Sequence, residues 1–156
     1  MFKPESAFIA LVNRNGLFLT VRRHFSVKNG ELWALPGGKA DEGETALQAG
    51  VRELSEELGL AVDPKKHGYL ALRSGKNWAF VVPWIPTAPQ HAHLITLING
   101  KMHNPEEIEE VKWQSWREIC SIPRLHKSLE ILALRVPADL DSGLFEMLEH
   151  RLPTHP

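Results

Sequence analysis

The chain has 156 residues, of which 43% are hydrophobic, and its formal net charge at pH 7 is −1. This length and apolar content predict one globular domain over residues 1–156 with a substantial buried core. A nearly neutral chain without a Lys/Arg block gives no electrostatic basis for binding a nucleic-acid polymer or a membrane surface.

The sequence also allows a prediction of the cellular compartment in which the protein is located. No run of about eighteen apolar residues occurs, and residues 1–5 do not begin a signal peptide, so we expect a soluble cytoplasmic protein. The single cysteine, Cys120, cannot form an internal disulfide, which fits a reducing compartment. We expect Cys120 to be buried as a small hydrophobic side chain.

The first elements in chain order are strands. Apolar runs at residues 7–13 and 17–23 flank an Asn15-Gly16 turn, which predicts a β-hairpin. Residues 32–35 predict a further short strand, followed by a turn at Gly37 and Gly38.

A helix is predicted next, over residues 45–58. Thr45 and Gln48 form a capping-box pattern, and Gly59 is a typical helix stop. At helical spacing, one stripe is apolar and is expected to face the core, while the opposite face is acidic. The apolar stripe contains Leu47, Val51, Leu54 and Leu58, and the acidic face contains Glu53, Glu56 and Glu57.

The acidic face predicts a metal site. Carboxylates at positions i, i+3 and i+4 repel one another unless a cation lies among them, and Mg²⁺ prefers oxygen ligands shared with substrate phosphates. Three small residues, Ala46, Ala49 and Gly50, lie on the same side of the helix as the acids. We interpret their small size as leaving room for a backbone loop or a pyrophosphate to approach. The alternative is a solvated helix face with an Arg52–Glu56 ion pair. That alternative does not explain the glycine-rich segment just upstream.

More strands and then helices follow. Residues 69–73 and 78–84 predict a second hairpin around residues 74–77, and residues 94–98 and 108–113 are further strand candidates. Apolar residues at helical spacing predict helices over residues 124–135 and 138–151. This order of elements implies a mixed sheet covered by helices.

The segment from Gly38 to Leu60 resembles the Nudix box of the Nudix hydrolase family. The pattern is a glycine, five residues, a glutamate, seven residues, Arg-Glu, an aliphatic residue, any residue, Glu-Glu, any residue, a glycine and an aliphatic residue. It is satisfied at every fixed position, by Gly38, Glu44, Arg52, Glu53, Leu54, Glu56, Glu57, Gly59 and Leu60. So many fixed positions are a specific signal. The resemblance implies an α/β/α sandwich with a central mixed β-sheet.

The resemblance also implies roles in a pyrophosphate-cleaving site. Glu53, Glu56 and Glu57 should ligate Mg²⁺ or Mn²⁺ together with the backbone carbonyl of Gly38. Arg52 and Glu44 should orient these acids. The general base differs among family members: Glu53 is the first candidate, and Glu107, in the acidic run 103–110, is the second.

Three further residues are candidates for substrate binding. Arg23 ends the second strand near the glycine loop and could bind a phosphate, although it could also be an ordinary strand-end charge. Lys39 follows the glycine loop. Trp78 could stack on a base, or it could belong to the core or its rim.

The resemblance implies an enzyme that hydrolyses a nucleoside diphosphate linkage in a small nucleotide. The lead-in at residues 33–39 favours a nucleoside triphosphate cleaved to monophosphate and pyrophosphate. An alternative is a pyrophosphatase of ADP-ribose, a sugar nucleotide or a dinucleotide. An alternative of another class is a nucleotide sensor without turnover, which a complete box disfavours. Strand edges in this fold make a homodimer possible.

Overall fold

The structure, a computed structural model, describes residues 3–136. Its centre is a mixed sheet in the order β3-β2-β1-β6-β5, with β4 also paired to β1 and β7 to β2. The strands are β1 (Ser6–Val12), β2 (Phe18–Arg23), β3 (Trp33–Ala34), β4 (Gly37–Lys39), β5 (Leu70–Ser74), β6 (Asn77–Pro83) and β7 (Ile108–Gln114). Strands β1 and β6 pair in parallel, and the other pairs are antiparallel.

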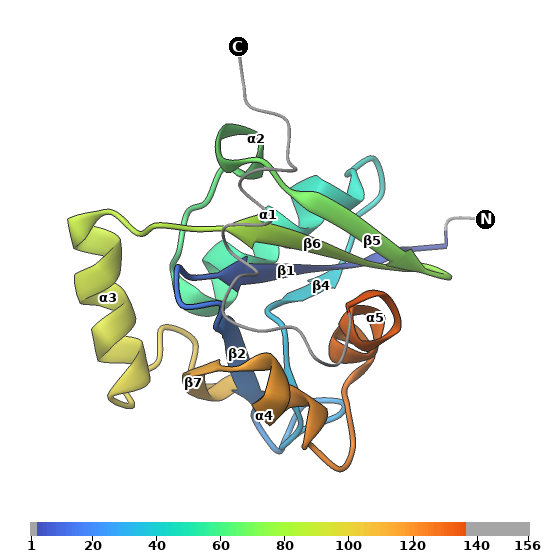
Figure 1. The fold of residues 1–156 in the computed structure, drawn as a ribbon. Coiled ribbons are helices and arrows are strands. Elements are labelled where there is room, and N and C mark those ends of the chain that lie inside the picture. Colours follow the sequence, from blue (N-terminus) through green and yellow to red (C-terminus); the bar gives the residue numbers. More distant parts are fainter. Residues whose placement is uncertain (1–2, 137–156) are drawn as a thin grey trace.

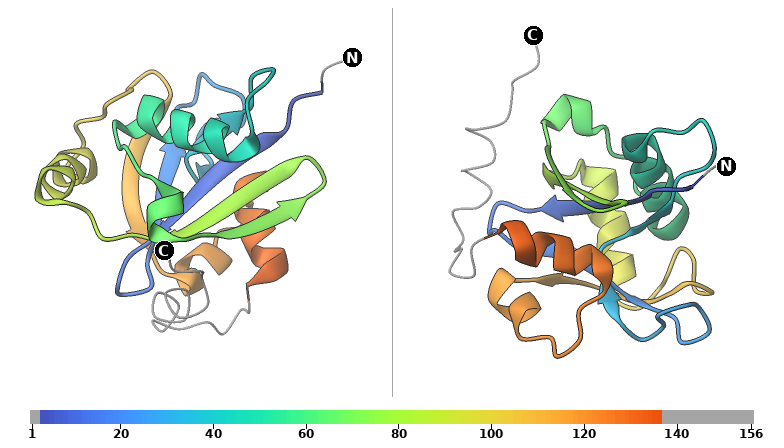
Figure 2. Two further views of the ribbon diagram at one scale, coloured as in Figure 1. Left: turned by 90° about the horizontal axis from the view of Figure 1, so that it is seen from above. Right: turned by 90° about the vertical axis from the view of Figure 1, so that its right-hand side faces the viewer.

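Helices lie on both faces of the sheet (Figure 1). They are α1 (Ala46–Leu58), α2 (Pro64–His67), α3 (Ala88–Ile98), α4 (Trp116–Cys120) and α5 (Lys127–Arg135). Figure 2 shows α1 on one side of the sheet and α5 on the other. The expected α/β/α sandwich with a central mixed sheet is therefore confirmed.

Strand β1 separates two hydrophobic cores by the alternation of its side chains. Ile9 and Leu11 belong to the core under α1, whereas Phe8 and Val12 belong to the core under α4 and α5. All seven residues of β1 are buried, as expected for a strand covered on both faces. The central strand thus anchors the two layers that form the candidate site.

Both predicted hairpins are present, as β1–β2 and β5–β6. The prediction of a strand at residues 94–98 is wrong, because these residues form the end of α3. Thr87 caps that helix and exchanges hydrogen bonds with Gln90 in a capping box, which starts a helix before the apolar run begins. Within residues 3–136, no helix is both long enough and apolar enough to cross a membrane.

The predictions for the carboxyl-terminal part of the chain, two helices and a buried Cys120, are only partly confirmed. Helix α5 begins at Lys127 rather than at residue 124, because the His126 side chain accepts the N–H of Ser128 and caps the helix there. The helix expected over residues 138–151 lies outside the described residues. Cys120 is exposed, so its expected burial is wrong: it ends α4, whose buried residues are Trp116 and Ile119.

Helix α1 has the predicted bounds and capping box, but a different face meets the sheet. Leu54 and Leu58 are buried as expected, whereas Leu47 and Val51 are only half-buried. A Cβ on Gly50 would lie 2.9 Å from Ile9 Cδ1 of β1. Gly50 therefore gives room to a strand of the sheet, and its expected role as clearance for a pyrophosphate is wrong.

Candidate active site

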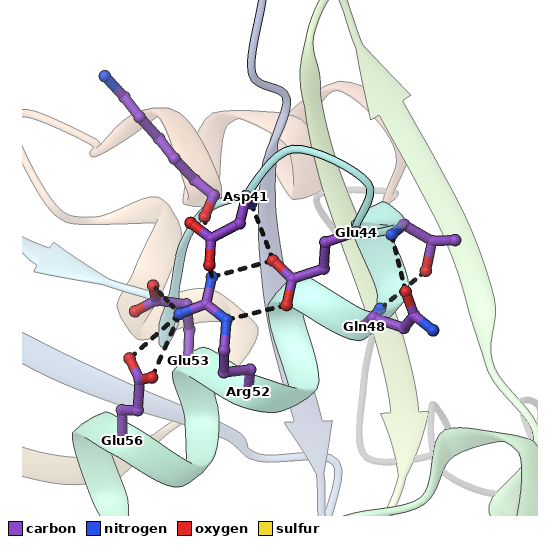
Figure 3. Close-up of polar contacts among 8 residues, drawn as sticks. Asp41, Glu44, Gln48, Arg52, Glu53 and Glu56 are labelled. Carbon is purple, nitrogen blue, oxygen red and sulfur yellow. Dashed lines mark hydrogen bonds and ion pairs between the residues drawn. The ribbon is translucent and has the colours of Figure 1, made fainter.

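Arg52 is the central residue of a network of hydrogen bonds on α1 (Figure 3). Its Nε donates to Glu44 Oε2 at 2.9 Å and its Nη2 donates to Glu44 Oε1 at 3.0 Å, which makes a bidentate pair. Its Nη1 donates to Glu53 Oε1 at 3.0 Å and to Glu56 Oε2 at 3.2 Å. Nη2 also donates to the carbonyl of Lys39 at 3.1 Å, so Arg52 joins the helix to the glycine loop.

Glu44 is the residue that Arg52 holds by two hydrogen bonds. The hydrogen bonds from Arg52, and then that from the N–H of Asp41, lower the pKa of Glu44. In turn, the hydrogen bond to Glu44 is the largest influence that raises the pKa of Arg52. Glu44 and Arg52 therefore stay charged, and Arg52 is hydrogen-bonded to both Glu53 and Glu56.

Glu53 lies against the glycine loop. A Cβ on Gly38 would be 2.7 Å from Glu53 Cδ, so only glycine leaves room for this carboxylate. Burial raises the pKa of Glu53, and the hydrogen bond from Arg52 opposes the rise.

Glu57 is the most buried of the acids, with 3% of its surface exposed. Its Oε1 accepts the backbone N–H of Gly37 at 2.9 Å. Burial raises the pKa of Glu57 to about 8, and the nearby charge of Glu53 adds to the rise. The fold thus holds two neighbouring carboxyl groups whose joint ionisation is unfavourable without a cation.

A cavity of about 360 Å³ opens in front of these acids. Besides α1, the cavity is lined by β1, the end of β2 and the loop after it, the glycine loop of β4, the segment before β7, and the start of α5. Its acidic lining residues are Glu53, Glu57 and Glu107, and its cationic ones are Arg23, Lys28, Lys39 and Lys127. A cavity with separate carboxylates and cations can hold a metal ion and a phosphate chain together.

The carboxylates fit a hard divalent cation, because they offer oxygen ligands and two of them line the cavity. Glu53 and Glu57 line the cavity next to Gly38, whereas Glu56 is 55% exposed and is paired with Arg52. Within residues 3–136, no three His, Cys, Asp or Glu side chains converge as a ready-made metal group. Ligation by all three helix glutamates therefore requires Glu56 to leave Arg52.

The three substrate-binding candidates are not brought together. Arg23 and Lys39 line the cavity, and the Arg23 guanidinium donates to the carbonyl of Lys28 at 3.2 Å. Trp78 is not among the lining residues. One face of its indole stacks on Phe80, the Arg73 guanidinium lies 4.9 Å from the ring centroid, and Nε1 donates to Glu5. The geometry gives no support to base stacking on Trp78.

Sequence reasoning missed Lys28, His126 and Lys127, which also line the cavity. Lys28 follows Arg23 closely and could have been found from its place in the loop after β2. His126 and Lys127 come from α5, and no motif in the sequence links that helix to the glycine loop. Only the sheet, which places α5 opposite α1, reveals them.

A comparison with family models matches the NUDIX domain to residues 2–134. Together with the complete box and its geometry, this match defines the class of protein: the chain belongs to the Nudix hydrolase family and is a hydrolase.

Individual relatives agree with this assignment. The chain is 35% identical over 141 residues to a protein named phosphatase NudJ of Escherichia coli (strain K12), covering 86% of this chain and 84% of the relative. It is 32% identical over 137 residues to an RNA pyrophosphohydrolase of Erythrobacter litoralis, covering 78% of this chain and 79% of the relative. A MutT NUDIX hydrolase from Burkholderia pseudomallei has the same fold, with a TM-score of 0.58 and 22% identity over 87% of this chain and 100% of that one.

Proposed function

We propose that this protein hydrolyses nucleoside triphosphates to the monophosphate and pyrophosphate in a reaction that depends on Mg²⁺ or Mn²⁺. The observation that carries the proposal is the shared cavity, in which buried carboxylates of α1 lie beside a group of cationic side chains. A pyrophosphate linkage needs its negative charge neutralised and its phosphorus placed in line with water. The two sets of lining residues supply these requirements separately.

Glu53, Glu56, Glu57 and the carbonyl of Gly38 are the groups that would hold the divalent cation. Such a cation neutralises negative charge on the phosphate oxygens and orients the scissile linkage. Arg52 and Glu44 position these ligands through the bidentate pair and the hydrogen bond to Glu53. The raised pKa values of Glu53 and Glu57 support a cation at this place, because a positive charge favours their ionised forms.

A carboxylate must accept the proton of the attacking water. We assign this role to Glu53, which lies in the cavity beside Gly38 and is held by Arg52. Glu107 is the second candidate, since it lines the same cavity from the segment just before β7. As water bonds to phosphorus, the phosphoanhydride P–O bond breaks and its electron pair leaves with the pyrophosphate oxygen.

Arg23 and Lys39 would bind the phosphate chain. Both line the cavity, and an arginine can contact phosphate oxygens through two N–H groups at once. Two of the relatives are named RNA pyrophosphohydrolase, which makes RNA a competing substrate. The nearly neutral chain gives no electrostatic support for a long polymer.

The test is a Mg²⁺-dependent release assay with purified protein. The panel contains canonical and oxidised nucleoside triphosphates, a 5′-triphosphorylated RNA oligonucleotide, ADP-ribose, nucleotide sugars and dinucleoside polyphosphates. We expect pyrophosphate from the mononucleotide triphosphates, at a higher kcat/KM than from any other member. Preference for the RNA end, ADP-ribose or a sugar nucleotide would contradict the substrate assignment, and nucleotide binding without turnover of any member would indicate a sensor.

A further inference from the structure

Among the described residues, the cationic side chains of the cavity have no carboxylate within 4.0 Å, although three glutamates line the same cavity. Among residues 3–136, ion pairs within 4.0 Å involve other cations, namely Arg22, His24, Arg52 and Arg73. The guanidinium of Arg23 donates to the backbone carbonyl of Lys28. Unpaired like charges in one cavity repel one another, and a bound anion would relieve that repulsion.

Lys127 is the member of this group that comes from the far side of the sheet. It is the first residue of α5, at the helix end where the backbone dipole disfavours a positive charge. Its Nζ lies 3.4 Å from Ser6 Oγ and 5.9 Å from the centroid of the Phe8 ring. Burial, followed by the charges of nearby Lys39, Lys28 and Arg23, lowers the pKa of Lys127. A lysine held at this point therefore has a local electrostatic cost.

His126 fixes the start of α5 without adding charge. Its Nδ1 lies 3.1 Å from the backbone N of Ser128, which donates to it, and 2.9 Å from Ser128 Oγ. The same Oγ accepts the N–H of Leu35, so its hydroxyl hydrogen is available to His126 Nδ1. Burial lowers the pKa of His126 to about 4, which keeps the ring neutral. The positive charge at the start of α5 therefore rests on Lys127.

We propose that Lys127 binds a phosphate of the substrate beyond the scissile linkage, and thereby makes the site prefer triphosphates to diphosphates. This inference rests on the proposed function, in which the α1 carboxylates and their cation hold the reacting linkage. Lys127 lines the same cavity but comes from a different element, so it can contact the part of the phosphate chain that the carboxylates do not hold. It is outside the Nudix box and acts on binding rather than on the chemical step.

The test compares two adenosine analogues whose α–β bridge is a methylene group, one a triphosphate and the other a diphosphate. Their binding to the full-length protein with Mg²⁺ is measured by isothermal titration calorimetry. We expect Lys127→Gln to weaken binding of the triphosphate analogue by roughly 10-fold, the loss of one charge-assisted contact, and that of the diphosphate analogue by less than about 3-fold. Lys127→Arg should retain most of the affinity, and Lys101→Gln, an exposed lysine outside the cavity, should bind like the wild type.

Equal weakening for both analogues would overturn the inference, as would a Lys127→Gln protein that binds the triphosphate like the wild type. Failure of Lys127→Arg to restore affinity would also overturn it, because a merely structural lysine would give that result. If the wild-type protein binds neither analogue, the proposed function itself fails, and this outcome is distinct from an effect confined to the Lys127 variants.

Discussion

Glu57 is a buried carboxylate, and it accepts a hydrogen bond from the backbone N–H of Gly37. Glutamine can accept the same hydrogen bond, since its side-chain carbonyl has the shape of the carboxylate. We therefore expect Glu57→Gln to keep the fold while reducing Mg²⁺-dependent turnover by roughly 100-fold or more, because a ligand charge is lost. Turnover and the circular dichroism spectrum of the variant test this. Wild-type activity in the variant would contradict the metal assignment.

The same residue makes the metal-free protein sensitive to pH. Burial raises the pKa of Glu57 from 4.5 to about 8, so the folded state binds more protons than the unfolded state between these values. The free energy of unfolding should therefore fall as pH rises through this window, by about 5 kcal/mol in order of magnitude. Urea unfolding in EDTA at several pH values measures the effect.

Glu57→Gln supplies the control for that experiment, because it lacks the titrating carboxyl group. Its free energy of unfolding should change less between pH 5 and pH 8 than that of the wild-type protein. Added Mg²⁺ should restore wild-type stability at pH 8, where the carboxylate is most strongly ionised. Parallel pH profiles for the two proteins would show that Glu57 is not the titrating group.

Gly38 is the other residue whose identity follows from its contacts. An added Cβ would lie 2.7 Å from Glu53 Cδ and 2.9 Å from Glu53 Oε1, so Gly38→Ala must displace that carboxylate. We expect kcat to fall by roughly 10-fold or more, since small displacements of a catalytic group are costly, while the melting temperature changes little. Gly43→Ala is the matched control, because its Cβ would meet nothing within 4 Å although its φ of +84° adds strain. A larger loss of activity in the control would contradict this interpretation.

At the scale of the element, α1 has a capped amino terminus and an acidic face that lines the candidate site. Thr45 caps α1 and Thr87 caps α3, each in a capping box with a glutamine three residues later. Thr45→Ala and Thr87→Ala should each lower the free energy of unfolding by about 1 kcal/mol. Only Thr45→Ala should also lower kcat/KM, because it loosens the helix end next to Glu44. Equal kcat/KM in the two variants would argue that the cap does not affect the site.

The elements show what sequence patterns can predict and where they fail. The capping pattern of Thr45 and Gln48 and the stop at Gly59 predicted α1, and local spacing decides which of its side chains share a face. The same spacing could not tell that Gly50 faces Ile9, since that contact depends on how α1 docks on the sheet. Periodicity also failed at residues 94–98, where a cap located seven residues earlier decides that the segment is helical.

At the scale of the whole molecule, the cavity is a property of the tertiary fold. Glu53 and Glu57 come from α1, whereas Glu107 and Lys127 belong to segments that follow the Nudix box by about fifty residues or more. No local pattern connects these segments. The long-range pairing of β2 with β7, in which Phe18 lies opposite Gln114, brings the Glu107 segment to the site. For this reason local sequence patterns singled out the carboxylates of α1 and missed Lys127.

The parallel pairing of β1 with β6 has a consequence for how the chain is made. Ser6 lies opposite Asn77 and Val12 lies opposite Pro83, so this edge of β1 has no partner until about seventy more residues have been synthesised. A nascent chain that ends before β6 exposes the apolar edge of its most buried strand, and such edges promote association between chains. Slow or interrupted translation between α1 and β6 is therefore the stage at which aggregation of this protein is favoured.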